Sequence, residues 1–387
     1  MPAEKKKQKK AGRSAERKRR HHVLPYVLLI AVPAAFLGLF VLLRDRQGVM
    51  DWLILHVTAP YKRWISGLLD DLPFAMAEVL CIGLAVLAVI WLIRTVYLLI
   101  RRPGRFGRLV RRVIAGVSAA LIIYCGFTLL WGINYYGTSF SEQAGLTRRG
   151  ATTSELYSLA SAFAVKLNEL ADSVSRDEDG VFNETVEEIF ARSEGLYDGI
   201  TAEYAFLDAP ERTPKGLAVS PLISYLGFTG FYFPFTGEAV LNTDAPACLL
   251  PATVAHELSH QRGVTDEDEA NFVAVLACLR SDDPVYQYSG CLLAYIHLSN
   301  ALYEADSTLS SEVRATLDED VRADLTANNT YWNNLASSST RETVKNAAES
   351  AYDSFTSSYG EEDVMERYEA CVELLVAYYF DSDTEGE

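Results

Sequence analysis

The chain has 387 residues, a formal net charge of −16 and a hydrophobic content of 49%, values that fit an ordinary protein of two domains. The charge is divided unevenly, because residues 1–135 hold 21 basic and 7 acidic residues whereas residues 136–387 hold 14 and 44. A second part with a net charge of −30 argues against nucleic acid as a partner, since such binding depends on cationic side chains. The asymmetry predicts that the two parts occupy different environments.

Three apolar segments in the first part are each long enough to cross a bilayer as a helix: residues 23–43, 74–100 and 113–133. A basic tail (residues 1–22) precedes the first segment, and a basic loop separates the second from the third. Because lysine and arginine favour the cytoplasmic side, both should be cytoplasmic. We therefore predict three transmembrane helices within residues 23–135, the lipid bilayer as a partner, and an extracytoplasmic domain of residues 136–387 at a cytoplasmic membrane.

The remaining segments predict a mainly α domain with a short β element. Apolar residues recur at helical spacing from about residue 152, and helices resume after residue 246. Between them, residues 214–246 are rich in glycine, proline and aromatic residues, which predicts loops around one or two short strands, with residues 238–242 the best candidate. Residues 44–72 look amphipathic, as expected of a segment on the membrane surface. Four cysteines lie in the outer domain, and the sequence leaves their pairing open: Cys248, Cys278, Cys291 and Cys371.

Residues 256–260, HELSH, carry the clearest chemical signal. His256 and His260 are four residues apart, so on a helix they share one face and can bind one metal ion. Glu257 follows the first histidine, where it reaches a water molecule rather than the metal, in the arrangement of zinc metallopeptidases. Two histidines on an ordinary helix are the alternative, and an accidental match is expected in roughly one of a hundred such sequences. Gly263 predicts the end of this helix.

A catalytic zinc site needs a third protein ligand and an open position. Glu267 and Asn271 are four residues apart on the next helix, so Glu267 can bind the metal while Asn271 orients a histidine. Glu269 is the alternative ligand, although it also fits a capping role in which Asp266 and Glu269 bond to each other's backbone amides. Tyr225, Tyr232 and His297 are candidates for stabilising a developing oxyanion, and each is also an ordinary core residue type.

Several of these motifs together resemble one family. The stretches HELSHQRG, EDEANF and FTGFYFPFTGEAVLN, placed after three apolar segments that end in WGINYY, look like the DUF3810 family of bacterial membrane proteins of unassigned function. EDEAN also looks like an element of other HExxH metallopeptidases, and that resemblance implies a zincin-like domain with Glu267 as the ligand. Where many of those proteins carry aspartate, this chain has Asn271. By the same resemblance, residues 237–242 would bind substrate as an edge strand through main-chain hydrogen bonds; the alternative is a strand that only packs.

The sequence thus predicts a membrane-anchored zinc metallopeptidase. One Zn²⁺ would be bound by His256, His260 and Glu267, with Glu257 as general base and a peptide or protein as the substrate. The rival is a non-catalytic envelope sensor or assembly protein, whose metal site is structural or vestigial. An intact Glu257 favours the enzyme, since a structural zinc site has no use for that carboxylate.

Overall fold

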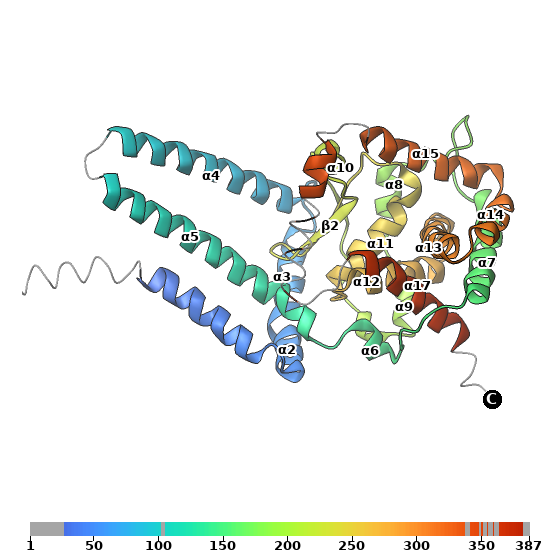
Figure 1. Ribbon diagram of the computed structural model, residues 1–387, viewed down its shortest axis with the longest axis horizontal. Helices are drawn as coiled ribbons and strands as arrows, with labels where there is room; N and C mark the ends of the chain where they lie inside the picture. Colours follow the sequence, from blue (N-terminus) through green and yellow to red (C-terminus); the bar gives the residue numbers. More distant parts are fainter. Residues whose placement is uncertain are drawn as a thin grey trace, which may run out of the picture.

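The computed structural model describes residues 27–101, 105–336, 341–347 and 364–381, together with residues 350, 354 and 359. It shows a mainly helical protein in which a group of apolar helices projects from one side of a larger helical body (Figure 1). The predicted basic tail of residues 1–22 lies outside the described residues.

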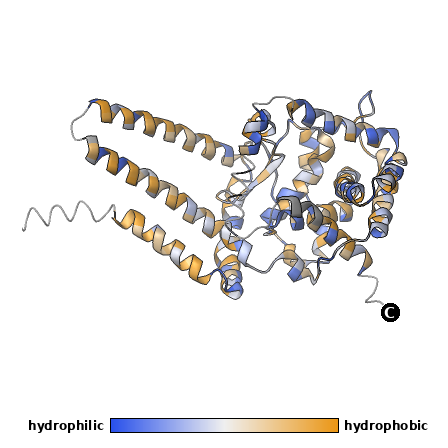
Figure 2. Cartoon of the chain, viewed as in Figure 1, coloured by the Kyte–Doolittle hydropathy of each residue, from blue (hydrophilic) through white to orange (hydrophobic). Residues whose placement is uncertain are grey.

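Two helices are long and apolar enough to span a membrane: α4 (Met76–Arg101) and α5 (Arg105–Leu130). In their most apolar windows only 6% and 17% of residues are buried, so their apolar side chains face outward (Figure 2). A third apolar helix, Val27–Leu43, lies alongside them. The described part of this helix is shorter than a full membrane span. The first residues of the predicted segment, 23–26, lie outside the described part. The structure therefore shows two candidate spans where the sequence predicts three. α5 also begins eight residues before the predicted segment.

A surface segment runs across the ends of these helices, where they meet the body (Figure 1). It comprises α2 (Gln47–Leu53), one π-helical turn η1 (Ile54–Thr58) and α3 (Ala59–Leu69). Its exposed apolar side chains are Trp52, Leu55, Trp64 and Leu68. Large exposed apolar residues on a helix beside candidate spans are typical of a helix that lies in the membrane interface. This agrees with the amphipathic pattern of residues 44–72.

The further helices of the body are short to medium in length. They include η2 (Gly132–Tyr136), α6 (Phe140–Ala144), α7 (Thr153–Ala171), α8 (Val186–Ala191), α9 (Asp198–Thr201), η3 (Ala205–Leu207), α10 (Ser220–Leu226), η4 (Ala247–Leu249), α11 (Leu250–Gln261), α12 (Glu267–Arg280), α13 (Pro284–Ala305), α14 (Ser307–Ala315), α15 (Glu319–Ala336) and α17 (Val364–Phe380). Capping boxes begin α6, α7 and α8, in each case a Ser or Thr paired with a Glu three residues later. α7, α11, α12, α13 and α17 pack around the main core.

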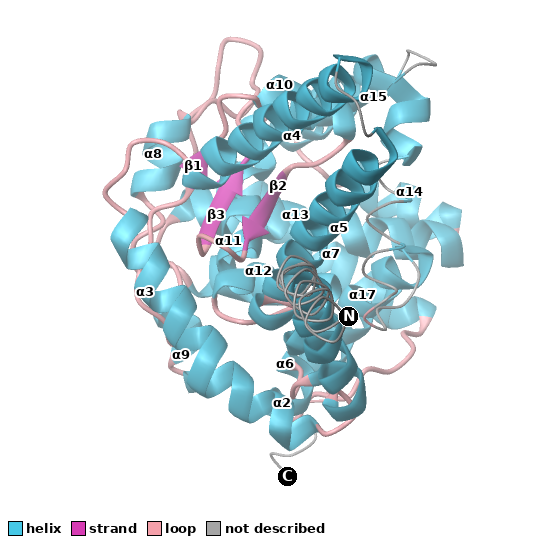
Figure 3. Ribbon diagram, turned by 90° about the vertical axis from the view of Figure 1, so that its left-hand side faces the viewer, coloured by secondary structure: helices cyan, strands magenta, loops and turns pink. Residues whose placement is uncertain are grey.

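The β element is a three-stranded sheet of order β1-β3-β2 (Figure 3). β1 (Lys215–Gly216) is parallel to β3 (Glu238–Leu241), and β2 (Gly230–Phe233) is antiparallel to it. One face packs on the main core through Ala239 and Leu241, and the other packs through Val240 on the start of α4. The expectation that residues 237–242 form an edge strand is wrong, because β3 is the middle strand and is paired on both sides. β2 is the edge strand next to α11.

Two carboxylates connect α4 to the sheet. Glu238 of β3 accepts hydrogen bonds from the first amides of α4, at Met76 (3.0 Å) and Ala77 (2.8 Å). In return, Glu78 of α4 accepts from the Val219 amide at 2.8 Å. An anionic side chain at a helix start satisfies otherwise unbonded amides and complements the helix dipole. The candidate span is thereby held directly on the strand beside α11. All six cysteines are unpaired.

Candidate metal centre

α11 and α12 carry the candidate site and are joined by a tight turn. Gly263, just after α11, has φ of 105°, a left-handed conformation that glycine adopts without strain, as its predicted role requires. Asp266 then caps α12 by accepting hydrogen bonds from the amides of Asp268 and Glu269, both at 3.0 Å. The turn folds α12 back against α11, so that Glu267 faces both histidines of the HELSH segment.

Three potential ligand atoms converge at this point. The Nε2 atom of His256 lies 3.1 Å from Nε2 of His260 and 3.1 Å from Oε2 of Glu267. The Nε2 atom of His260 lies 3.6 Å from the same carboxylate oxygen. Ligand atoms about 2.1 Å from a tetrahedral zinc ion are separated from one another by roughly 3.4 Å. The spacing of the three side chains therefore fits one zinc ion, with a fourth position left for a water molecule or a substrate.

The other nitrogen of each imidazole is held by a fixed partner. His260 Nδ1 lies 2.7 Å from the carbonyl oxygen of Val264, which can only accept, so Nδ1 carries the hydrogen. His256 Nδ1 lies 3.0 Å from Oδ1 of Asn271, the position predicted to orient a histidine. A neutral imidazole protonated at Nδ1 presents a free lone pair at Nε2, which is the form that binds metal.

The charge state of the group also suits a cation. Burial opposes ionisation of Glu267, but the charges of His260 and His256 and their hydrogen bonds hold its pKa well below the usual range. Burial likewise opposes protonation of His260, yet the carboxylate of Glu267 raises the pKa of that imidazole. An anionic oxygen beside two imidazoles is the donor set that Zn²⁺ prefers.

Glu257 lies beside this group, with its carboxylate close to Gly230 of β2. Its side chain is buried between α11 and the sheet, and its Oε2 has no hydrogen-bond partner among the described residues. Burial raises the pKa of the Glu257 carboxyl to about 8, although the positive charge of His256 opposes the increase. A Cβ atom placed on Gly230 of β2 would lie 2.9 Å from Oε1 of Glu257, so only glycine leaves the carboxylate room. A carboxyl group with a pKa near neutrality can both accept and return a proton.

Glu269 has a different role from Glu267. Its carboxylate is buried and accepts hydrogen bonds from the amides of Phe140 (2.8 Å) and Ser141 (3.0 Å) and from the Ser141 hydroxyl (2.6 Å). Arg148 approaches it to 3.8 Å. The carboxylate thus joins α12 to the start of α6, rather than completing a capping box with Asp266. These contacts consume the oxygens that a metal would need.

A cleft of about 270 Å³ opens beside the three convergent side chains. His256 and Glu267 form one wall, Thr229 lies next to β2, and Asn328 and Trp332 of α15 form the opposite side. Such a cleft gives a ligand direct access to the candidate metal position. Nothing in the sequence placed α15 here, because it follows α11 by about sixty residues and carries no motif.

The predicted oxyanion stabilisers lie at different places around the site. Tyr232 of β2 is buried, with its hydroxyl unbonded among described residues, and its ring packs 5.2 Å from that of Trp131. His297 of α13 is buried, and burial, assisted by the charge of His256, lowers its pKa to about 4, so it is neutral at physiological pH. Tyr225 lies on α10, half-buried.

Two residues near the site were not anticipated from the sequence. Trp131, the first residue of the WGINYY stretch, packs edge-on against His260 with ring centroids 5.5 Å apart. Lys62 of α3 places its Nζ 4.7 Å from the centre of the Trp131 ring and 5.0 Å from that of Tyr232. The surface segment therefore reaches the metal centre through one aromatic side chain.

Comparison with known proteins gives one match. The profile of the family described as "Protein of unknown function (DUF3810)" matches residues 57–376, which include α3, both candidate spans, the sheet and the metal centre. No curated protein and no solved structure matches the chain. Since the match covers most of the sequence, the chain belongs to the DUF3810 family of proteins of unknown function.

Proposed function

We propose that this protein is a membrane-anchored zinc metallopeptidase. The observation that carries the proposal is the convergence of His256, His260 and Glu267 within bonding reach of one ion. Glu257 follows His256 directly in the sequence. A zinc ion held by these three residues supplies a Lewis acid, which makes water acidic near neutral pH and polarises a carbonyl group. Asn271 and the Val264 carbonyl keep both imidazoles in the tautomer that binds.

Glu257 supplies the proton chemistry. Its carboxylate takes a proton from the attacking water and returns it to the nitrogen of the departing amine. Burial against the sheet gives the group a pKa suited to both steps, and Gly230 leaves space for its movement. Histidine ligands alone would serve a structural zinc equally well, so the position of Glu257 is what favours catalysis.

β2 is the strand along which we propose that the substrate binds. The amide of Asn242 donates to the carbonyl of Thr229 at 2.9 Å, and antiparallel pairs alternate between bonded and non-bonded positions. Phe231 and Phe233 consequently bond to β3, whereas the amides and carbonyls of Gly230 and Tyr232 point away from it. A peptide extended along this edge can bond to those two residues and pass the metal centre.

The proposed location is a bacterial cytoplasmic membrane, with three spans and the helical body on the outer side. The start of the helix Val27–Leu43, the end of α4 and the start of α5 lie at the end remote from the body (Figure 1). Three spans with a cytoplasmic N terminus require this arrangement. Lysine and arginine are concentrated at that end. Protease added to spheroplasts should degrade the body while sparing the α4–α5 connection; protection of the body until the membrane is permeabilised would reverse the topology.

The catalytic test uses the full-length protein in detergent or nanodiscs. Mass spectrometry should find about one zinc per wild-type chain and none in folded His256→Ala. New N-termini generated from a peptide library should appear with wild type and disappear with Glu257→Gln, which should still hold zinc. Glu304→Gln, an exposed acid on α13, is the matched control and should cleave normally. Zinc binding with equal cleavage by Glu257→Gln and wild type would refute the catalytic assignment. Zinc without any cleavage would favour the sensor or assembly role.

A further inference from the structure

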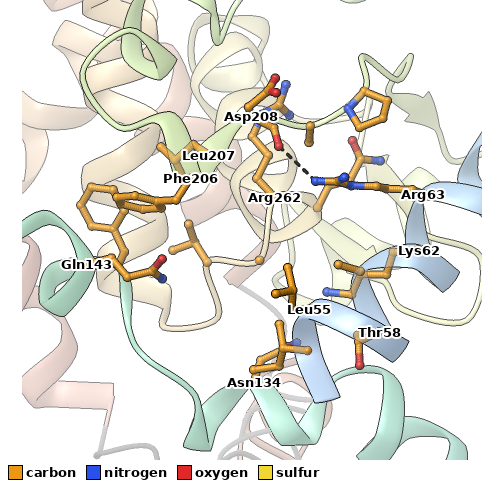
Figure 4. A pocket seen from close by; sticks show the side chains of 18 of the residues that line it. Leu55, Thr58, Lys62, Arg63, Asn134, Gln143, Phe206, Leu207, Asp208 and Arg262 are labelled. Atoms are coloured by element: carbon orange, nitrogen blue, oxygen red, sulfur yellow. Dashed lines mark hydrogen bonds between the residues drawn. The ribbon is translucent and has the colours of Figure 1, made fainter. Parts of the chain in front are cut away.

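A second cavity lies on the other side of the α11 C-terminus from the metal centre. Its volume is about 620 Å³, and it shares no lining residue with the cleft beside His256. Figure 4 shows it between α3, which carries Lys62 and Arg63, and the chain at Phe206–Asp208, with Arg262 above and Asn134 below. The surface segment that crosses the ends of the candidate spans thus forms one wall. The cavity is large enough for a small organic ligand or a lipid headgroup.

The lining of this cavity is basic, in contrast to the rest of the body. Four cationic residues line it, against two acidic residues, Asp51 and Asp208. The four are Lys62, Arg63, Arg212 and Arg262. The Asp51 carboxylate is occupied by the Thr138 amide and hydroxyl, both at 2.8 Å. Arg212 and Arg262 also approach carboxylates outside the lining, those of Asp70 (3.8 Å) and Glu211 (3.3 Å). The positive charge that remains for an anionic ligand is therefore mainly that of Lys62 and Arg63.

Lys62 is the cation least compensated by its surroundings. Its side chain is 6% exposed, and within the described residues it has no acidic partner, only the faces of Trp131 and Tyr232. Burial lowers the pKa of this amine to about 7. Burying an ammonium group is unfavourable unless it is paired, and an anion in the cavity would pair it.

Neutral polar groups beside Lys62 are also unsatisfied. Asn134 is 8% exposed, and neither its Nδ2 nor its Oδ1 has a hydrogen-bond partner in the part of the chain that the structure describes. Oε1 of Gln261 is likewise buried and unbonded among those residues. A buried polar group without a partner destabilises the folded state, and a bound ligand with matching groups removes that cost. Phe206 and Leu207 make the side of the cavity across from Lys62 apolar, and Leu55 lies near Lys62 (Figure 4).

The cavity lies at the level where the candidate spans end. Asp51 follows the end of the first apolar helix, Leu43, by eight residues, and Asn134 follows the end of α5, Leu130, by four. Exposed Trp52 and Trp64 mark the same surface segment. Phosphate groups of lipids lie at this depth, and an interfacial cavity with basic residues suits an anionic headgroup.

We propose that this cavity binds the phosphate-bearing headgroup of an anionic membrane lipid, with Lys62 and the Asn134 amide contacting the phosphate. The apolar side then receives the glycerol and the first carbons of the chains. The proposal does not depend on the metal centre, because it concerns a separate cavity. A soluble phosphate compound has the same head chemistry, so the experiment distinguishes the two sources.

The test is native mass spectrometry of the full-length protein released from nanodiscs that contain phosphatidylglycerol and phosphatidylcholine. Wild type should retain phosphatidylglycerol in preference to phosphatidylcholine. Lys62→Met, which keeps the aliphatic stem, and Asn134→Leu, which keeps the volume, should each weaken that retention by roughly tenfold, the change expected for a lost charge-assisted hydrogen bond. Arg46→Met removes an exposed charge at the same surface, outside the cavity, and should leave retention unchanged.

Equal retention by wild type and both cavity variants would overturn the proposal. If neither variant folds, the proposal can still be tested with the wild-type protein and a photoreactive phosphatidylglycerol. This lipid should crosslink to residues 51–66 and 134–143. Crosslinks confined to α4 and α5 would reject the site. In detergent without anionic lipid, inorganic phosphate is the probe for the soluble source. A rise in the melting temperature of wild type but not of Lys62→Met, without any lipid preference, would overturn the lipid assignment in favour of a soluble phosphate compound.

Discussion

Replacing Glu269 with alanine should destabilise the protein but leave it able to bind zinc. Replacing Glu267 with alanine should abolish zinc binding but leave the stability of the metal-free protein nearly unchanged. The two carboxylates are two residues apart on α12, and both lie in its first turn. Glu269 accepts three hydrogen bonds from Phe140 and Ser141, within a buried environment. Glu267 instead faces the two histidines, His256 at 3.1 Å and His260 at 3.6 Å.

The magnitude follows from those bonds. A hydrogen bond to a charged group contributes at least about 1.5 kcal/mol, so losing three should lower the unfolding free energy by about 4 kcal/mol. In a folded body of this size, that loss corresponds to a fall in melting temperature of roughly 10 °C. Glu267→Ala removes the contacts with the two histidines but none of the backbone hydrogen bonds that Glu269 accepts, so the melting temperature of the chelated protein should stay within a few degrees of wild type.

The assay is thermal unfolding of the full-length protein with a chelator present, followed by zinc analysis of each variant after exposure to zinc and removal of excess metal. Measuring stability without metal separates the two effects, because bound metal would itself stabilise the folded state. Folded Glu269→Ala lacking zinc, together with Glu267→Ala retaining it, would refute the assignment of both residues. A normal melting temperature for metal-free Glu269→Ala would refute the role given to the Phe140 and Ser141 contacts.

Three other substitutions test the surroundings of the site. Asn271→Leu removes the hydrogen-bond acceptor of His256 Nδ1. It should weaken zinc affinity by about 10–100-fold in a competition titration with a chromogenic chelator. An unchanged affinity would contradict the role of Asn271 in orienting His256. Gly230→Ala places a methyl group 2.9 Å from the Glu257 carboxylate and should reduce peptide cleavage while zinc content, measured in parallel, stays at one per chain. The pKa of Lys62 is about 7 in the folded protein, against 10.5 in the unfolded chain. Between these two values the unfolded chain binds more protons than the folded protein does. The free energy of unfolding should therefore increase as pH rises from 7 towards 10.5. In zwitterionic detergent at pH 7, Lys62→Met should therefore be more stable than wild type by up to about 4 kcal/mol, and the difference should shrink towards pH 10. A difference in melting temperature between the two proteins that stays constant with pH would contradict the burial of a charged amine.

The features that the sequence predicted correctly are those that depend on the spacing of residues within one helix. Apolar runs of more than twenty residues predicted the candidate spans, and α4 lies within two residues of its predicted bounds. The four-residue spacing of His256 and His260, and again of Glu267 and Asn271, places each pair on one helix face, and the structure brings these four residues together. Helix geometry links such positions directly, so no knowledge of distant packing was needed.

Expectations that required distant partners were less successful. The sequence offered Asp266 as the partner of Glu269, but the carboxylate bonds to residues 128 and 129 positions away. The strand of residues 238–242 was correctly located, yet its place in the middle of the sheet depends on β1 and β2, and the edge belongs to β2 instead. Strand order cannot be read from the composition of a single strand.

The sequence by itself determined the mainly α class, the apolar helices, the amphipathic surface segment and the helix faces that carry the possible metal ligands, because each depends on neighbours within one or two turns. Only the tertiary structure decided that Glu267 and not Glu269 faces the histidines, that Trp131 packs on His260, and that Lys62 and Asn134 share a cavity at the membrane side. Those contacts join residues that are tens to hundreds of positions apart, and they arise when the chain buries its apolar faces and must satisfy the polar groups that are buried with them.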